Sequence, residues 1–222
     1  MKKKTMGGID VPEASDAFRT LATLASKWAA EQQKSDAVFA ALLEFHGRLM
    51  LLEPQRATAA ATRKTLGQEG MLLLQAKHVR SLENLLCALQ ISVTKFEALH
   101  SDVSEVYAEI CHRHSSGSSP VDGSHEQQQR WGVLGAGRGL DAQSVGLPPP
   151  DTCIAWVREC DQQFAAELLL KLEILDRLDL GRTSEELHGL HRLWTLQPNL
   201  APATLERTRA LAESLRPPPP TM

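Results

Sequence analysis

The sequence has few aromatic residues, no excess of either charge and no long apolar run. Phe, Trp and Tyr make up 5% of the 222 residues, and Leu and Ala supply most of the hydrophobic content. This composition favours helices over strands. The formal net charge of −3 gives no basic excess for phosphate neutralisation, and no apolar run approaches the length of a membrane span. The composition therefore predicts a helical protein without direct nucleic-acid or membrane partners.

The cysteines form no disulfide or redox pattern. None of the four has a partner at Cys-x-x-Cys spacing: Cys87, Cys111, Cys153 and Cys160. The lysines at 2–4 have no apolar run behind them, as a secretory signal would have. Both absences predict a reduced intracellular protein.

No residue pattern predicts a metal, a cofactor or a catalytic site. Cys111, His112 and His114 cluster near a helix end, but structural zinc needs four ligands and no second pair has suitable spacing. Solvated histidines and packed thiols are the favoured interpretation. The glycine-rich segment 132–139 lacks the preceding strand of a nucleotide loop, and no serine lies in a Gly-x-Ser-x-Gly elbow. We therefore expect neither enzymatic activity nor a cofactor.

An unbroken heptad lies between Leu82 and Ile110. Seven residues make two helical turns, so side chains seven apart share one stripe, which must be buried against another helix. Such a stripe is more typical of an interaction subunit than of an enzyme. Its first row is Leu82, Leu89, Phe96, Val103 and Ile110, and its second is Leu85, Leu86, Val93, Leu99, Val106 and Tyr107.

The heptad belongs to a predicted helical hairpin over residues 14–114, preceded by a disordered N-terminus, 1–13. The first helix has an apolar stripe that Gln32 and Ser35 interrupt. Pro54 is expected to break this helix, because it donates no backbone hydrogen bond. The second helix is expected from near Gln55 to His112. A short connection makes such a pair antiparallel, so the fold class is an all-α helical hairpin or coiled-coil bundle.

A linker and a C-terminal helical segment follow the hairpin. Residues 115–150 are rich in Gly, Pro, Ser and Gln and are predicted to be disordered. Residues 151–216 are predicted to form three helices, the first capped by Asp151 or Thr152 and ended by Gly181. A proline-rich tail covers 217–222. The expected apolar face of the first of these helices is Ile154, Val157, Phe164, Leu168, Leu172 and Leu175, widened by Leu169, Leu170, Ile174 and Leu178.

Three blocks resemble the cyclin-dependent kinase 2-interacting protein family. They are Lys27-Trp28 in the first helix, the segment 82–90 (LENLLCALQ), and the segment 168–171 (LLLK) followed by Trp194-x-x-Gln197-Pro198. The similarity covers about residues 17–215, and the Trp-x-x-Gln-Pro block is its most specific part. The linker and the proline tail depart from the family pattern.

The resemblance implies a non-catalytic adaptor that associates with a second small helical protein and with tandem-ring AAA ATPases. It further implies roles in large ribosomal subunit maturation and in replication-linked protein unfolding. Association with a cyclin-dependent kinase or a checkpoint kinase complex, and a nuclear location with or without a cytoplasmic pool, are also implied. The alternative is a coiled-coil subunit of an unrelated tethering or cytoskeletal complex, which would share the heptad but not the Trp-x-x-Gln-Pro block.

The predicted partner-binding residues follow from the heptad and the C-terminal block. Trp194 is left with two interpretations, an interface anchor or a core residue of the chain's own domain. The set comprises Leu82, Leu85, Leu86, Leu89, Val93, Phe96, Leu99, Val103, Val106, Ile110, Leu190, Trp194, Gln197 and Pro198.

Overall fold

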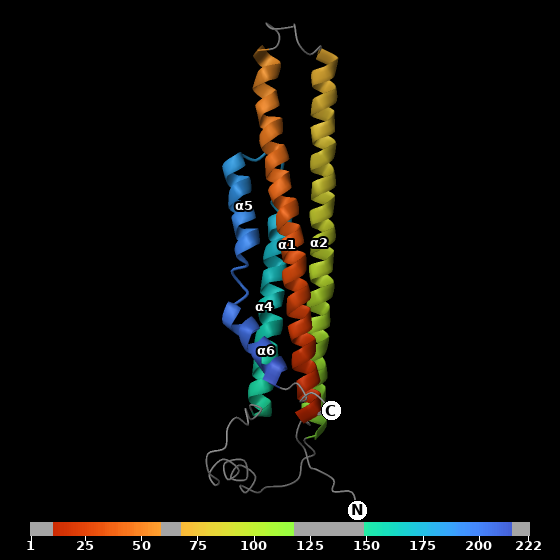
Figure 1. Ribbon diagram of the computed structural model, residues 1–222, viewed down its shortest axis with the longest axis vertical. Helices are drawn as coiled ribbons and strands as arrows, with labels where there is room; N and C mark the ends of the chain where they lie inside the picture. Colours follow the sequence, from red (N-terminus) through yellow and green to blue (C-terminus); the bar gives the residue numbers. More distant parts are fainter. Residues whose placement is uncertain (1–10, 59–67, 118–148, 215–222) are drawn as a thin grey trace, which may run out of the picture.

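The computed structural model describes residues 11–58, 68–117 and 149–214, and within these ranges every regular element is a helix. The predicted all-α class is therefore confirmed. The helices are α1 (Val11–Thr58), α2 (Gln68–Gly117), α4 (Pro150–Asp176), α5 (Ser184–Leu196) and α6 (Pro202–Ser214) (Figure 1). Residues 1–10 of the predicted disordered N-terminus (1–13), residues 118–148 of the predicted linker (115–150) and the proline tail lie outside the described residues. Residues 11–13, 115–117 and 150 are helical, so the predictions of disorder and linker are wrong there.

Helices α1 and α2 form the predicted antiparallel pair (Figure 1). With 48 and 50 residues, each is roughly 70–75 Å long at 1.5 Å per residue. Trp28 lies against Phe96, with ring centroids 4.4 Å apart, and Phe45 lies against His78 at 5.7 Å. These two contacts fit one antiparallel register of α1 and α2.

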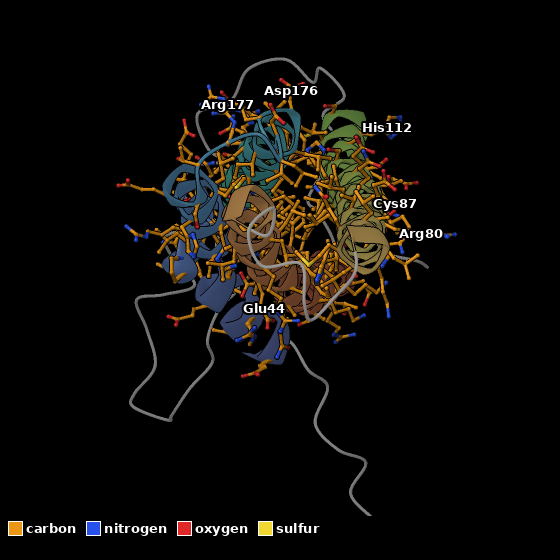
Figure 2. The ribbon with its side chains drawn as sticks, turned by 90° about the horizontal axis from the view of Figure 1, so that it is seen from above. Glu44, Arg80, Cys87, His112, Asp176 and Arg177 are labelled. Carbon is orange, nitrogen blue, oxygen red and sulfur yellow. The ribbon has the colours of Figure 1, made fainter. Side chains whose placement is uncertain are left out.

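The C-terminal helices complete a bundle around the lower part of the hairpin. Helix α4 packs on α2, whereas α5 and α6 pack on α1. Helices α5 and α6 follow each other along the bundle axis and together occupy the place of a fourth helix (Figure 1). Seen along this axis, Arg80, Cys87 and His112 lie on the outer side of α2, away from the other helices (Figure 2).

Apolar side chains from all five helices form one core. Its largest fully buried members are the aromatic residues Trp28, Trp194, Phe18, Phe39 and Phe96. Burying a side chain of this size contributes roughly 1.5–3 kcal/mol relative to exposure. The few aromatic residues of the chain are thus concentrated where they bury the most area.

Four predicted helix boundaries are wrong. The second helix does not begin near Gln55, because Gln55 lies in α1 and α2 begins at Gln68. Helix α1 continues through Pro54 to Thr58, because a proline this close to the end removes only one backbone hydrogen bond of a helix held by packing elsewhere. Helix α4 has Pro149 at its N-cap without any side-chain cap, so neither Asp151 nor Thr152 caps it. The same helix ends at Asp176, five residues before Gly181.

The buried face of α4 also differs from the predicted one. Leu169 and Leu172 are exposed, whereas Glu167 and Lys171 are fully buried. Apart from Leu168, the buried positions follow two heptad rows, Cys153, Cys160, Glu167 and Ile174 in one and Val157, Phe164 and Lys171 in the other. Leucines outnumber the available core positions on this helix, and the packing partners decided which ones are buried.

Candidate interaction site

The predicted heptad stripe lies in the chain's own core. Leu82, Leu89, Phe96 and Val103 have no exposed area, and Val93, Val106 and Ile110 are buried. Leu85, Leu86 and Leu99 are half-buried against the same core. The helices that cover the stripe, α1 and α4, belong to this chain. Partner binding through these side chains stays a prediction, and it would require the bundle to open.

Trp194 is a core residue of the chain's own domain, and its additional use as an interface anchor stays a prediction. Its side chain has no exposed area. The indole Nε1 donates to Ser35 Oγ at 3.1 Å, and Gln32 Nε2 donates to the Trp194 carbonyl oxygen at 2.8 Å. Gln32 and Ser35, the residues that interrupt the apolar stripe of α1, therefore bind α5. Leu190 is half-buried against the same core.

The rest of the Trp-x-x-Gln-Pro block shapes the connection between α5 and α6. Gln197 is the C-cap of α5 and has a left-handed backbone conformation, with φ 46° and ψ 59°. Its carbonyl oxygen accepts from the Leu200 backbone N–H at 3.0 Å. Pro198 is exposed. The block thus turns the chain at the end of α5, whether or not it also binds a partner.

A buried ion pair supports Trp194 from the other side. Lys171 Nζ lies 3.3 Å from Glu167 Oε1, and neither side chain is exposed. The same ammonium lies 4.4 Å from the Trp194 ring centroid and 5.0 Å from that of Phe96, which are cation–π distances. Burial lowers the pKa of Lys171 to about 8 and raises that of Glu167, while the attraction between the two opposes both shifts. Sequence analysis missed this pair, because Glu and Lys four residues apart normally lie on a solvated face.

The described cysteines and histidines form no metal centre. Among the described residues, no three His, Cys, Asp or Glu side chains are placed to hold a metal ion. Cys153 and Cys160 are buried thiols whose pKa is raised by desolvation, as expected of packed thiols. Within the described helices, none has a stretch apolar enough and long enough to span a bilayer.

The exposed apolar side chains gather where the hairpin extends beyond the other helices. His46 Nε2 lies 3.1 Å from the Leu180 carbonyl oxygen, in the connection between α4 and α5. Above this level α1 and α2 project alone (Figure 1). We call this projecting part, residues 47–58 and 68–82, the stalk. Six of its aliphatic side chains are more than a third exposed: Met50, Leu51, Leu72, Leu73, Leu74 and Val79.

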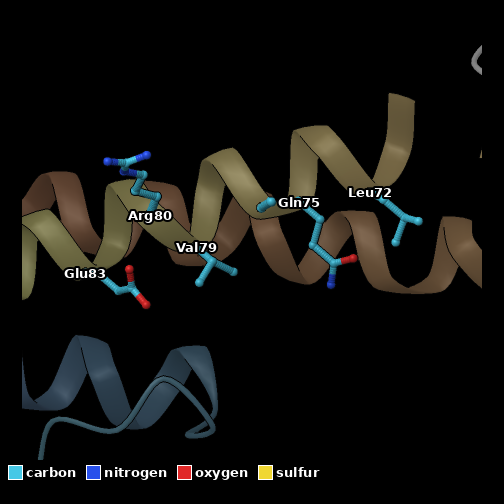
Figure 3. A pocket seen from close by; sticks show the side chains of 6 residues that line it. Leu72, Gln75, Val79, Arg80 and Glu83 are labelled. Carbon is cyan, nitrogen blue, oxygen red and sulfur yellow. The ribbon is translucent and has the colours of Figure 1, made fainter. Parts of the chain in front are cut away.

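A shallow groove runs along α2 in the stalk. It is lined by Leu72, Gln75, Ala76, Val79, Arg80 and Glu83. Leu72, Gln75, Val79 and Glu83 point to one side of the helix, and the C-terminal part of the chain lies beneath only the Glu83 end of the row (Figure 3). Sequence analysis missed this surface, because its leucines continue the apolar pattern of the buried helix.

The fold and its surfaces define a class: a helical bundle that buries its longest heptad internally and exposes apolar side chains on a projecting hairpin. Comparison with protein families gives the identity within this class. The model of the family described as ribosome biogenesis protein C1orf109-like matches residues 12–213, and the chain belongs to this family. No curated protein matches the chain. The match is to this family's model, so membership of the cyclin-dependent kinase 2-interacting proteins stays a prediction.

Proposed function

We propose that this chain is a non-catalytic adaptor that joins a tandem-ring AAA ATPase complex to large ribosomal subunit maturation. The observation that carries the proposal is the family match over residues 12–213, since the family is one of ribosome biogenesis proteins. The ATPase, the second small helical protein and a nuclear location are taken from the resemblance of the three sequence blocks. Roles in replication and checkpoint signalling, including kinase binding, also come only from this resemblance and not from the family match.

The architecture supports an adaptor. A single core fixes five helices into one body, so that α1 forms a rod of roughly 70 Å. A rigid rod holds partners that bind near its two ends at a set distance and angle. The exposed aliphatic side chains of the stalk are a surface for such contacts, because groups of exposed apolar residues mark interaction sites.

The test is purification of the tagged full chain from its own cells, with quantification of stoichiometric partners. We expect an ATPase with two ATPase modules and a second small helical protein. Depletion of the chain should lower the large-subunit peak of a sucrose gradient and leave the small-subunit peak unchanged. Recovery of tethering or filament proteins in their place, with normal subunit peaks, would contradict the proposal.

A further inference from the structure

The stalk exposes two helix faces that are covered further down the bundle. On α2, two residues that face α4 are Ser104, which donates to Asp161, and Tyr107, which accepts from Arg158. The row through Tyr107 continues as His100, Val93, Leu86, Val79 and Leu72. Val93 is buried and Leu86 half-buried, but Val79 is 36% and Leu72 48% exposed. The covering helix α4 ends at Asp176, before this row does.

The neighbouring face of α1 behaves in the same way. Asp36 contacts His191 Nε2 at 3.1 Å on α5. Seven residues on, Leu43 is half-buried against the core, and seven further, Met50 is 37% exposed. The start of α5 at Ser184 leaves this end of the row uncovered. The stalk is therefore half of a helical bundle whose other half is missing.

The chain outside the described helices is too short to supply that half. Residues 118–148 join Gly117 to Pro149, both at the end of the bundle opposite the stalk (Figure 1). A path along α4 and back requires roughly 80 Å and reaches only the foot of the stalk. Leu72 lies ten residues, about 15 Å, beyond Leu82, so a path to Leu72 and back requires roughly 110 Å, whereas 31 fully extended residues span about 105 Å. Ten N-terminal residues span at most roughly 35 Å, whereas about 54 Å of α1 separates Val11 from the stalk. The eight residues after α6 are shorter still, and the nine residues between α1 and α2 contain one large apolar residue, Leu66.

Charge argues against a second copy of the chain. Residues 47–82 contain six Lys and Arg but only two Glu, whereas the rest of the chain has 18 Lys and Arg and 25 Asp and Glu. Two stalks packed together would bring like charges near each other. Lys77 and Arg80 form no ion pair with any described residue, so they are available to acidic groups of a partner.

The side chains argue against RNA. Segments 47–58 and 68–82 contain no Phe, Tyr or Trp, and single-stranded nucleic acid is bound by stacking on aromatic rings. Aliphatic residues at helical spacing instead match the apolar seam of an amphipathic helix.

We propose that the stalk groove, whose lining includes Leu72 and Val79, binds an amphipathic helix of another protein, whose apolar seam is flanked by acidic residues. The occupant continues the positions of α4 and α5 and packs its seam on Leu72 and Val79. Its acidic residues pair with Arg80, which lines the edge of the groove. This inference rests on the proposed adaptor function only in that the chain acts by binding other proteins.

Site-specific photocrosslinking tests the inference in the full chain. The photoreactive amino acid p-benzoylphenylalanine replaces Leu72 or Val79 in cells, and the crosslinked peptides are sequenced. The matched control position is Leu169, which is 66% exposed on α4. We expect both stalk positions to crosslink to one foreign helix with apolar residues three or four apart and an acidic excess beside them. Arg80→Glu should lower the yield at least tenfold, and Arg192→Glu on α5 should not.

The other outcomes overturn the inference. Crosslinks to the same chain would show a second copy in the groove, and yields no higher than at Leu169 would show no occupant. Binding of labelled ribosomal RNA that is lost with Lys77→Glu and Arg80→Glu, without a protein crosslink, would show a nucleic-acid surface. If the wild-type chain purifies no tandem-ring ATPase but both stalk positions crosslink as expected, the proposed function fails and the inference stands. If the ATPase is recovered and the crosslinks are absent, only the inference fails.

Discussion

At the scale of single residues, the core depends on a few large side chains that several helices share. Phe96 lies against Trp28 at 4.4 Å and against Trp194 at 6.4 Å between ring centroids, and thus joins α2 to α1 and α5. Truncating a buried Phe costs about 3–5 kcal/mol, and a charge left unpaired in its place costs more.

We therefore expect Phe96→Asp to unfold the chain itself. The control is Ile91→Asp on the same helix, where the side chain is 53% exposed. Circular dichroism should show helix loss for the first variant and a wild-type melting curve for the second. A folded Phe96→Asp protein that no longer binds partners would instead favour the predicted intermolecular use of the heptad.

The buried pair of Lys171 and Glu167 gives a second prediction at this scale. Lys171→Met leaves Glu167 as an uncompensated buried charge, which costs about 3–5 kcal/mol. Adding Glu167→Gln removes that charge and retains an acceptor for the Asn199 backbone N–H, now 3.3 Å from Glu167 Oε2. The double variant should recover most of the lost stability in urea unfolding. Equal destabilisation of the single and double variants would show that the lost stability does not come from an unpaired Glu167 charge.

The same pair makes stability depend on pH. The folded-state pKa of Lys171 is about 8, below the ordinary 10.5, so between these values the unfolded chain binds more protons and rising pH favours folding. The wild type should gain on the order of 2 kcal/mol over the double variant between pH 7 and 10. Lys34→Met, at an exposed lysine, is the control and should follow the wild-type curve.

At the scale of helices, the two ends of α5 differ in their backbone capping: the start has a capping box, whereas the end has a residue in a strained left-handed conformation. Thr183 and Glu186 make a capping box at its start, in which the Thr183 backbone N–H donates to Glu186 Oε2 at 2.9 Å. These hydrogen bonds lower the pKa of Glu186. At the other end, Gln197 is the only non-glycine residue with positive φ among the described residues. A side chain in this conformation costs about 1–2 kcal/mol.

Gln197→Gly should therefore stabilise the fold by about 0.5–1 kcal/mol, because glycine adopts this conformation without strain. Gln197→Ala is the matched control, since it removes the same side-chain atoms but keeps Cβ. Urea unfolding should rank the glycine variant above the wild type and the alanine variant at or below it. The reverse ranking would show that the Gln197 side chain, and not its backbone, matters at this turn.

At the scale of the whole molecule, folding and the proposed binding surface are separate. The buried apolar residues reach only Leu42 on α1 and Leu82 on α2, so the stalk contributes little to the core. Deleting residues 50–56 and 70–76 removes seven residues, or two helical turns, from each helix. The stalk becomes shorter, and the same helix faces still lie against each other.

The shortened chain should melt within about 4 °C of the wild type, since roughly 1 kcal/mol corresponds to 2–4 °C in a chain of this size. It should also lose the stalk crosslinks described above. A much larger drop in melting temperature, measured by calorimetry, would show that the stalk belongs to the folding core.

The sequence by itself determined the helices and their antiparallel pairing. Apolar spacing depends only on helical geometry, so the stripe from Leu82 to Ile110 predicted both the helix and its burial. Capping chemistry is local too, since Thr183 and Glu186 of the α5 capping box are only three residues apart. The resemblance to a related family reached the ribosome-linked role that the family match supports.

Only the tertiary structure decided what covers each face. A heptad is the same whether its partner helix lies in the same chain or in another, so the internal burial of Phe96 and Trp194 was open. Gln32, Ser35 and Lys171 are core residues because their polar groups form hydrogen bonds or an ion pair with other buried residues, up to 162 positions away in the sequence. Likewise, Leu72 and Val79 differ from the buried aliphatic residues of α2 in position, because α4 ends at Asp176 and α5 begins at Ser184, and neither covers the stalk.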